Sequence, residues 1–439
     1  MGSLAAAGLG FALFGPRGAK ENSGGRIVLD YWEKWTGHEG RAMQRVVDDF
    51  NRSQDRIHVR YLVTSAIDQK SMIAIAGGDP PDVIGLWNYN VPGYAESGAL
   101  IALDDLAPRF GVRPENYAAG MRPIMTHGGR LWATVNTGGT VALYYNKAMF
   151  REAGIDRPPQ TIEELDEVDR RLTRVSSDGR IERVGFLHTE PGWWSWIWGY
   201  SFGGSLYDES TQRSLVDSAP NAAAYRWIQE RTRRLGVEAI KRFVSSFGNY
   251  DSPQNAFLSG RVAMEVQGPW LANVVGAFHP DLDYGVAPVP VAANEYQRDA
   301  PVALIDTDIL VIPRGAPHPE ASMEFIAYTQ RQEVVEYLST IHCKNSPLAV
   351  SSEQFLANHP NRGVRIHDAL AKSPRSYLCP RTRTWLQFKE EFDAAAETIW
   401  TLRESADDEL RSLQVRTQAI LDRAADQRRR RSLAKRGDA

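Results

Sequence analysis

Residues 27–87 read IVLDYWEKWTGHEGRAMQRVVDDFNRSQDRIHVRYLVTSAIDQKSMIAIAGGDPPDVIGLW. This stretch contains three short apolar runs with the length of buried strands, Ile27–Leu29, Ile57–Val63 and Asp82–Leu86. An apolar face at helical spacing separates the first two runs, formed by Met43, Val46, Val47 and Phe50. A second helix is indicated before the third run, over Gln69–Ala76. Alternating strands and helices predict a mainly parallel sheet covered on both faces.

The same alternation returns farther along the chain. Further strands are predicted at Val141–Tyr145, Arg261–Val266 and Ile309–Ile312, and an extended passage over residues 284–301. Helices are predicted at Thr161–Leu172, which opens with a capping box, and at Ala222–Arg234, Pro253–Ser259, Pro319–Ser339 and from Trp385 onward. This pattern indicates two α/β lobes. The chain is expected to cross between them near Asn136–Thr140, Pro301–Asp306 and Pro347–Ser352.

Length and charge support this division and narrow the function. A chain of 439 residues can fill two cores, and its 43% apolar and 24% charged content is typical of globular proteins. The net charge is −3, whereas nucleic-acid-binding proteins are typically strongly basic, so the composition does not indicate a nucleic-acid binder. The basic run Arg428–Arg431 indicates a solvated helix end or tail, with membrane or partner contact as the alternative.

Two features bear on the cellular compartment. Gly2–Phe14 is an apolar run of signal-peptide length, which indicates an export signal, with an N-terminal extension as the alternative. No other segment is long and apolar enough to span a membrane. Cys343 and Cys379 fit no metal spacing, and both a disulfide and two buried thiols stay open.

The placement of the aromatic residues indicates a ligand site. Among the 12 tryptophans, some follow predicted strands or turns and others crowd together: Trp32, Trp35, Trp87, Trp193, Trp194, Trp196, Trp198 and Trp270. Ligands of open α/β sheets bind outside the carboxyl ends of strands. Flat aromatic rings suit the apolar faces of sugar rings, and a few polar anchors complete such a pocket. Candidate anchors are Glu33, Asp82, Asn88, Asn136, Glu190 and Arg383, and core packing is the alternative for any single tryptophan.

Enzymatic alternatives find weaker support. Gly199–Gly203 matches the G-x-S-x-G pattern, but Ser201 lacks the strand before it and the helix after it that the motif requires. No carboxylate pair stands out for glycoside hydrolysis, although sequence spacing does not exclude one. No phosphate-binding loop, dinucleotide fingerprint or H-E-x-x-H motif is present, and the nine histidines are scattered.

Taken in order, four motifs resemble the family 1 extracellular solute-binding proteins, whose relatives bind maltose and other oligosaccharides. They are the segments 82–104, 129–147, 256–270 and 308–325, and the most specific is AFLSGRVAMEVQGPW at 256–270. The resemblance places Trp87 and Trp270 at sugar-contacting positions, and Glu190-Pro191 with the following tryptophans at an aromatic platform. Residues 136–140 lack the acidic residue of maltose binders, which counts against maltose itself.

The resemblance implies a two-lobe periplasmic-binding-protein fold of type II, with the lobes joined by a multi-crossing hinge. The expected parts are a leader at 1–25, an N-terminal lobe at 26–137 plus 306–349, a C-terminal lobe at 138–305 plus 350–425, and a basic tail at 426–439. The residues expected to contact the ligand are Glu33, Trp35, Asp82, Trp87, Asn136, Trp193, Trp194, Trp196, Trp270, Asp306, Arg383 and Trp385.

The same resemblance implies an exported, periplasmic or otherwise extracytoplasmic monomer. It would capture a carbohydrate between its lobes and deliver it to the membrane permease of an ABC importer. Closure would be a population shift, because only the closed state lets both lobes touch the ligand. No catalysis, cofactor, metal or nucleic-acid partner is expected. The alternatives are another polar solute such as glycerol phosphate, for which Arg381 and Arg383 beside Trp385 leave room, and an enzyme acting on carbohydrate.

Overall fold

Five strands form the sheet of the first lobe, in the order β2-β1-β3-β15-β6. The first three strands of the chain run parallel, as their apolar runs predict, and occupy Ile27–Glu33 (β1), Ile57–Val63 (β2) and Val83–Trp87 (β3). A strand from late in the chain, β15 (Asp308–Val311), lies antiparallel between β3 and β6 (Ala133–Thr137). Distant parts of the chain therefore complete one lobe.

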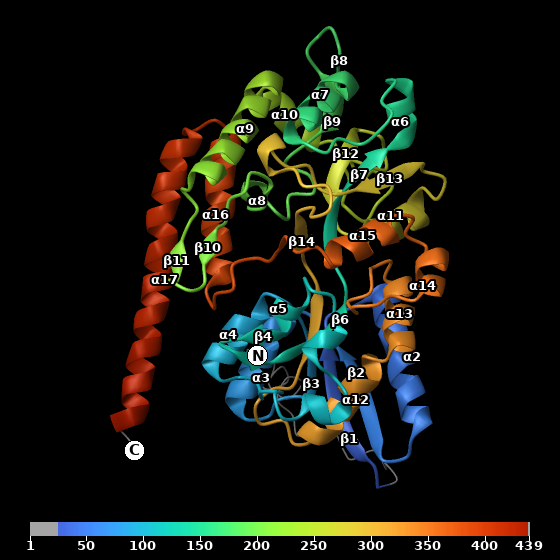
Figure 1. Ribbon diagram of the computed structural model, residues 1–439, viewed down its shortest axis with the longest axis vertical. Helices are drawn as coiled ribbons and strands as arrows, with labels where there is room; N and C mark the ends of the chain where they lie inside the picture. The colour runs from blue at the N-terminus through green and yellow to red at the C-terminus, as the bar shows by residue number, and fades with distance from the viewer. Residues whose placement is uncertain (1–24, 438–439) are drawn as a thin grey trace, which may run out of the picture.

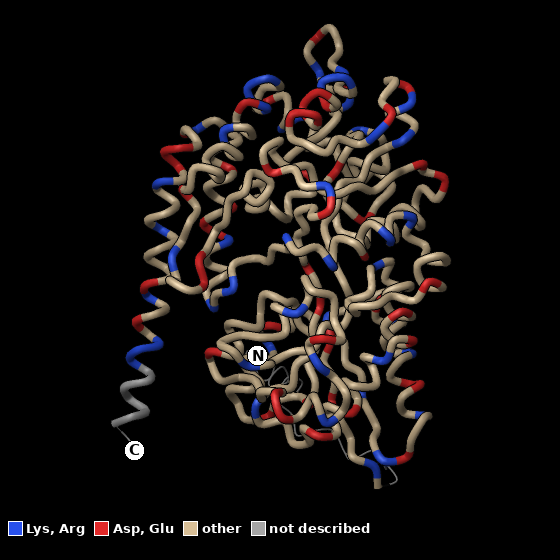
Figure 2. The backbone as a smooth tube through the Cα atoms, viewed as in Figure 1, with Lys and Arg blue, Asp and Glu red and all other residues tan. Residues whose placement is uncertain are grey.

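The computed structural model describes residues 25–437, with side chains as far as Arg430. The expected leader lies outside the described residues except for Gly25. Within the described part, no helix combines the length and apolar character needed to cross a membrane. Figure 1 shows two lobes, one above the other, joined by extended segments. Acidic and basic residues are interspersed over both lobes (Figure 2), in keeping with the small net charge.

Helices cover the first sheet because their apolar stripes face it. In α2 (Gly37–Ser53) the buried residues include Met43, Val46, Val47 and Phe50, the apolar face that their spacing predicts. The remaining helical segments of this lobe are α3 (Ile67–Gly77), α4 (Asn90–Ser97), η1 (Ala107–Phe110), η2 (Pro114–Asn116), α5 (Arg122–Met125), α12 (Pro319–Thr329) and α13 (Gln332–Ile341). A short hairpin joins β4 (Thr126–His127) to β5 (Arg130–Leu131).

The second lobe has a seven-stranded sheet around β7 (Thr140–Asn146). Its path is β16-β14-β7-β12-β9-β8, and β13 also pairs with β7. The other strands are β8 (Arg174–Val175), β9 (Ile181–Phe186), β12 (Val262–Gln267), β13 (Tyr284–Ala287), β14 (Ala303–Ile305) and β16 (Ser376–Tyr377). Pairs β12–β9 and β14–β16 are parallel, whereas β7 runs antiparallel to its three partners.

Helices flank this second sheet and extend beyond it. They are α6 (Lys147–Glu152), α7 (Ile162–Leu172), α8 (Trp198–Ser201), α9 (Ala219–Leu235), α10 (Val237–Val244), α11 (Leu271–Phe278), α14 (Glu353–Asn358), α15 (Val364–Ala371), α16 (Trp385–Trp400) and α17 (Ala406–Gly437), with a 3-10 turn η3 at Ala293–Glu295. The predicted capping box is only half formed: the side chain of Thr161 accepts a hydrogen bond from the Glu164 amide at the start of α7, but the Glu164 carboxylate accepts from the Gln160 amide. The hairpin β10 (Tyr207–Asp208) and β11 (Arg213–Ser214) packs against α17.

Two crossing segments between the sheets are bonded to each other. Gly138 and Gly139 connect β6 to β7, and Asp306 and Thr307 connect β14 to β15. The amide of Asp306 donates to the carbonyl of Gly139 at 3.0 Å. A Cβ on Gly139 would lie 1.9 Å from the carbonyl oxygen of Asp306, so only glycine permits this approach. A third crossing follows α13, where Asn345 accepts from the Gly138 amide at 3.0 Å.

A separate contact joins the lobes near the end of α17. There the guanidinium of Arg428 lies 3.7 Å from the carboxylate of Glu96, which also contacts His127 at 3.1 Å. His127 faces Glu209 of the second lobe at 3.9 Å. Figure 1 shows α17 and β10–β11 on the left of the view, and α2 and α11 on the right.

Some sequence expectations are wrong in detail. Pro253–Ser259 forms turns and no helix, because the Asn255 side chain accepts the amides of Phe257 and Leu258 and competes with helical bonding. The helix predicted over 319–339 is two helices, because Arg331 takes an extended conformation between α12 and α13. The helical region after Trp385 is likewise broken, where Leu402 has a positive φ between α16 and α17.

Three further outcomes concern single residues and one segment. Trp32 lies within β1 and packs on the core of the first lobe, because that strand runs to Glu33, farther than its apolar residues indicate. The extended passage over 284–301 contains β13 and is interrupted by η3. Cys343 and Cys379 are buried and free.

Candidate ligand-binding site

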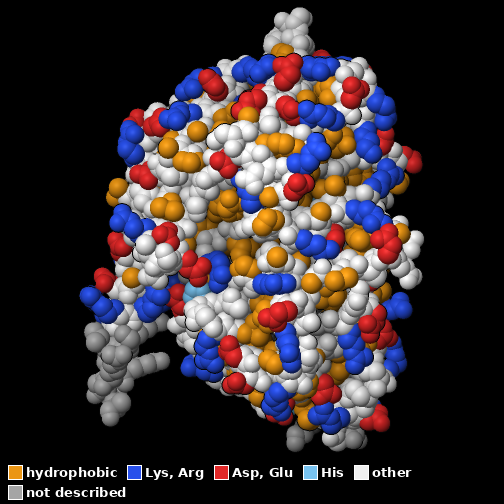
Figure 3. Space-filling view, viewed as in Figure 1, with side chains coloured by type: hydrophobic (Ala, Val, Ile, Leu, Met, Phe, Trp, Pro, Cys, Tyr) orange, Lys and Arg blue, Asp and Glu red, His pale blue; other side chains and the backbone are white. Residues whose placement is uncertain are grey.

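A cavity of about 1000 Å³ lies between the two lobes and is lined by residues of both. This volume is at the upper end of the range for small-molecule sites. One wall comes from the segment that joins β1 to α2, together with Trp87 at the end of β3. The opposite wall comes from α11 and the loops that carry Trp193 and Tyr250, and the crossing residues 306–308 lie between the walls. Figure 3 shows apolar side chains gathered between the lobes on the face in view.

Aromatic side chains form the wall of the second lobe. The ring centroids of Trp193 and Trp270 are 6.4 Å apart, and those of Trp194 and Trp270 are 6.1 Å apart. Tyr250 meets Trp193 edge to face at 4.8 Å. Trp193 is 38% exposed, which is unusual for so large an apolar side chain. An exposed ring supported by other rings offers a flat, apolar stacking surface to a ligand.

Two tryptophans with lysines against their rings form the wall of the first lobe. The ammonium nitrogen of Lys34 lies 5.2 Å from the ring centroids of both Trp35 and Trp87. The ammonium of Lys344 lies 5.3 Å from the centroid of the Trp35 ring. These distances are within the range of cation–π attraction. Two cations held by the same carboxylate therefore lie close to the Trp35 ring, and Trp35 is 4% exposed.

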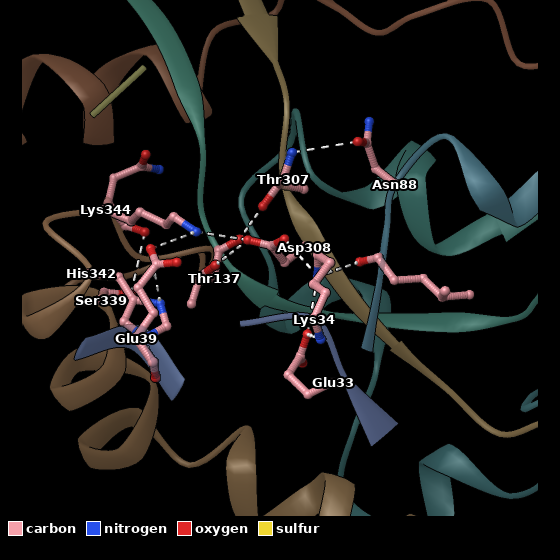
Figure 4. A network of polar contacts seen from close by, with 12 residues as sticks. Glu33, Lys34, Glu39, Asn88, Thr137, Thr307, Asp308, Ser339, His342 and Lys344 are labelled. Carbon is pink, nitrogen blue, oxygen red and sulfur yellow. Dashed lines mark hydrogen bonds and ion pairs between the residues drawn. The ribbon is translucent and has the colours of Figure 1, made fainter. Parts of the chain in front are cut away.

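The lysines meet at one carboxylate, that of Asp308 in β15 (Figure 4). One oxygen of Asp308 lies 2.9 Å from Lys34 Nζ and the other lies 2.8 Å from Lys344 Nζ. Glu33 lies 3.2 Å from Lys34, and Glu39 lies 3.6 Å from Lys344. Each buried charge thus has opposite charges beside it, as charges removed from water require.

These contacts set the ionisation of the cluster. Burial alone would raise the pKa of Asp308, but Lys34 and Lys344 hold it well below its usual value. Burial alone would lower the pKa of each lysine, yet Asp308 and the adjacent glutamate raise it above the ordinary value in both. The pKa of Glu39 is lowered in spite of burial, because Lys344 lies close to it. Asp308, Glu39, Lys34 and Lys344 are therefore ionised throughout the neutral pH range.

Asp306, two residues earlier, behaves in the opposite way. Burial raises its pKa to about 6, in spite of the hydrogen bond that it accepts from the Trp194 indole at 3.1 Å. It lines the cavity beside Thr307 and Asp308. Among the described residues no other hydrogen bond to its carboxylate is formed. One carboxylate oxygen is thus available to a donor from a ligand.

The structure brings five of the twelve predicted contact residues into the cavity lining. These are Trp35, Trp87, Trp193, Trp270 and Asp306. Trp194 lies directly behind them, through its bond to Asp306. Most of these residues were predicted because an aromatic residue comes at the end of a strand or just after a strand or turn. In this fold, such positions lie at the junction of the lobes.

The six remaining predicted residues also lie outside the lining. Glu33 is buried over Gly85 and accepts from the Tyr31 hydroxyl, so it holds Lys34 and does not reach the cavity. Asp82 is buried and accepts from the Asp30 amide at 2.8 Å. Trp196 and Trp385 pack edge to face at 5.0 Å in the core of the second lobe, at 4% and 3% exposed.

Asn136 and Arg383 complete this group. Asn136 is fully buried in β6, and its side-chain amide has no hydrogen-bond partner among the described residues. Arg383 lies on the loop before α16, beside Gly93 of α4. Of the other anchors, Asn88 donates its amide to Thr307 at 3.0 Å and so supports the crossing segment. Burial raises the pKa of Glu190 to about 7.

Sequence reasoning missed much of the polar floor of the cavity. Lys34, Glu39 and Lys344 carry no recognisable motif, and Lys344 follows a helix far along the chain. Asp308 was part of a motif, but only as the start of a strand. A charged residue directly after a buried strand was the available signal for Lys34, at the carboxyl end of β1.

The arrangement of the cavity suits the binding of a ligand. Ser201 lies at the end of α8, is 3% exposed and has no strand before it, so the nucleophile motif lacks its geometry. Within residues 25–437 no three potential metal ligands converge. Aromatic walls from two lobes, with hydrogen-bonding groups between them, can hold a polar ligand that has apolar faces.

Comparison with known proteins gives one family match. Residues 34–336 match the family model described as bacterial extracellular solute-binding protein. The maltotriose-binding protein of Pyrococcus abyssi is 23% identical over 326 residues, which are 73% of this chain and 66% of that protein, just under two thirds. The sn-glycerol-3-phosphate-binding periplasmic protein UgpB of Pectobacterium atrosepticum is 22% identical over 450 residues, covering 95% of this chain and 96% of that protein.

A solved structure resembles the fold over most of its length. The protein CpMnBP1, solved with mannotriose bound, superposes with a TM-score of 0.76 at 25% identity. The superposition covers 89% of this chain and 100% of that one. Two sheets with the chain crossing between them are therefore shared with a protein whose ligand is a sugar.

Proposed function

The chain belongs to the bacterial extracellular solute-binding proteins and has their two-lobe type II fold, and from this premise we propose that it captures a carbohydrate between its lobes and delivers it to the membrane permease of an ABC importer. The supporting observation is the cavity of about 1000 Å³ with indole rings on both walls. Aromatic platforms on opposite lobes suit a ligand with two apolar faces, such as a sugar ring.

The crossing segments supply the hinge of this proposal. We take 26–137 plus 306–349 and 138–305 plus 350–425 as the two moving bodies, with the Gly139–Asp306 contact at the hinge. A ligand that contacts both walls binds the closed arrangement more tightly than the open one and shifts the population toward it. The permease would then recognise the closed form. In this proposal the protein works as an exported monomer and makes or breaks no bond in its ligand.

Titration calorimetry with neutral oligosaccharides tests this proposal, starting from mannotriose and maltotriose. The expected result is saturable binding of at least one sugar and recovery of that sugar unchanged after incubation. Trp193→Ala should weaken the binding, because it removes an exposed ring of the lining. Chromatographic detection of shorter products would instead establish an enzyme, and a complete absence of heat across the panel would remove carbohydrate from the proposal.

A further inference from the structure

The cations of the cavity are already neutralised by carboxylates of the protein. Lys34 is shared between Asp308 and Glu33, and it also donates to the carbonyl of Leu86 at 3.2 Å. Lys344 is shared between Asp308 and Glu39. An ammonium group has three donors and no acceptor, so Lys34 has each of its donors engaged. A ligand phosphate would therefore meet no free donor on Lys34, and on Lys344 it would compete with two carboxylates that already neutralise the charge.

The balance of charge in the lining is acidic. Four carboxyl groups line the cavity, on Glu39, Asp251, Asp306 and Asp308, against two ammonium groups. No arginine is among the lining residues of the described chain. Sites that recognise phosphate use Arg forks, unpaired lysines or free backbone amides. The potential in this cavity therefore opposes an anion.

Backbone amides do not supply the missing anion site. The N-terminus of α2 borders the cavity, but Glu39 lies in its first turn and already offers a negative charge there. At α11 the first amides donate to preceding carbonyls, Leu271 to Gly268 and Ala272 to Pro269, both at 3.2 Å. The first amides of α11 are thus engaged, and at α2 the carboxylate of Glu39 places a negative charge near the helix N-terminus.

One polar group of the lining with capacity for a ligand, the Asp306 carboxylate, is an acceptor. The carboxylate of Asp306 has one oxygen engaged by the Trp194 indole and stands in the lining between the aromatic walls. A hydroxyl or an ammonium of a ligand can donate to it, whereas a phosphate or carboxylate oxygen meets it as a like charge. The aromatic rings nearby add attraction for a cation, through their faces.

We propose that this cavity accepts hydroxylated ligands that are neutral or carry an amine and excludes anionic ones, and that Asp306 and Glu39 are the residues that enforce this choice. The inference rests on the proposed function of the same cavity. It separates two ligand chemistries found among the relatives, oligosaccharide and glycerol phosphate. Asp306 acts by facing the ligand directly, and Glu39 acts by keeping Lys344 paired.

Calorimetry and thermal unfolding with matched probes test the inference. Mannotriose and maltotriose serve as neutral probes, glucosamine and chitotriose (the oligomer with free amines) as cationic probes, and sn-glycerol 3-phosphate and glucose 6-phosphate as anionic probes. We expect the wild-type chain to bind anionic probes at least about tenfold more weakly than the best neutral or cationic probe. A wild-type chain that binds an anionic probe best would overturn the inference and leave solute binding intact.

A charge-removing variant keeps the test independent of the natural ligand. The double substitution Asp306→Asn with Glu39→Gln removes two negative charges from the lining and leaves Asp308 to hold both lysines. We expect it to gain measurable affinity for sn-glycerol 3-phosphate, while Asp251→Asn, a control at an exposed lining position, changes that affinity less. An unchanged response of the double variant would contradict the roles of Asp306 and Glu39. If the wild-type chain binds no sugar but the double variant gains affinity for sn-glycerol 3-phosphate, the proposed function is rejected and the inference about charge is kept.

Discussion

Asp306 and Asp308 are neighbours in the chain, yet replacing each by asparagine should have opposite effects on stability. Asp308 is the common partner of two buried lysines, at 2.9 and 2.8 Å. Asp306 has an indole as its partner and a pKa raised to about 6 by burial. Asparagine keeps the shape and size of the side chain, so the comparison isolates the charge. The pair therefore tests whether the charge cluster is arranged as described.

The magnitude for Asp308→Asn follows from the ion pairs. Removing one partner of a buried pair costs about 3–5 kcal/mol, because the other charge stays buried without compensation. As a check, two ammonium groups roughly 6 Å apart repel by roughly 3 kcal/mol at an effective dielectric constant of 20. Glu33 and Glu39 remain close to the lysines and offset part of this repulsion. A loss of about 3–5 kcal/mol in the free energy of unfolding at pH 7 is expected.

The magnitude for Asp306→Asn has the opposite sign. At pH 7 the native chain holds an ionised carboxylate whose folded pKa is raised by about two units, which corresponds to at most roughly 3 kcal/mol of destabilisation. Asparagine removes this cost and can still accept from the Trp194 indole. The variant should therefore unfold at the same or a higher urea concentration than the wild-type chain.

Urea unfolding followed by circular dichroism at several pH values measures both variants. Because the folded pKa of Asp308 is depressed, its contribution is present above about pH 4 and is lost as the pH falls. The difference between wild type and Asp308→Asn should shrink below that pH. The contribution of Asp306 runs the other way, declining as the pH rises from about 4 to 6. A loss below about 1 kcal/mol for Asp308→Asn at pH 7, or a larger loss for Asp306→Asn, would refute the reasoning.

Three further predictions use other parts of the structure. Trp193→Ala should weaken sugar binding with little loss of stability, because Trp193 is 38% exposed. Trp196→Ala should lower the free energy of unfolding by about 3–5 kcal/mol, because its buried ring packs against Trp385. Calorimetry and urea unfolding measure both variants, and equal behaviour of the two would contradict this prediction. Burial raises the pKa of Glu265 to about 8, so the wild-type chain should lose stability as the pH rises from about 4 to 8. In Glu265→Gln the unfolding free energy, measured by urea unfolding, should depend less on pH over this range. An equal pH dependence in both proteins would count against a neutral buried carboxyl group. Gly139→Ala should perturb the hinge, because the added Cβ would lie 1.9 Å from the Asp306 carbonyl oxygen. Its sugar affinity should fall further than that of the control Gly276→Ala, where no atom lies within 4 Å of the added Cβ. Equal affinities in the two variants would mean that the crossing segments can separate without cost.

Much of the architecture could be predicted because its signals are local. The apolar face of α2 and the limits of β2 follow directly from periodicity and run length. The N-cap residue Thr161 places the start of α7, because its side chain accepts a hydrogen bond from one otherwise unpaired amide. The missed helix breaks at Arg331 and Leu402 depend on single backbone conformations that periodicity does not report.

The site was only partly predictable because half of it is assembled from distant segments. Trp87 ends β3 and Trp270 follows β12 after a short turn, so their place at the junction is a consequence of topology. Lys344 comes to Asp308 only through the third crossing, and no pattern around it indicates a buried charge. Trp196 and Trp385 show the converse error, since aromatic crowding does not distinguish a cavity wall from a core.

The most direct measurement of the central claim is small-angle scattering of the chain with and without a saturating neutral oligosaccharide that calorimetry has identified. The account predicts that the sugar lowers the radius of gyration, because a ligand held by walls on both lobes favours their approach. It also predicts that sugar at about 100 times its dissociation constant adds about 2.7 kcal/mol to stability. A sugar that saturates the protein and leaves the radius of gyration unchanged would contradict capture between the lobes.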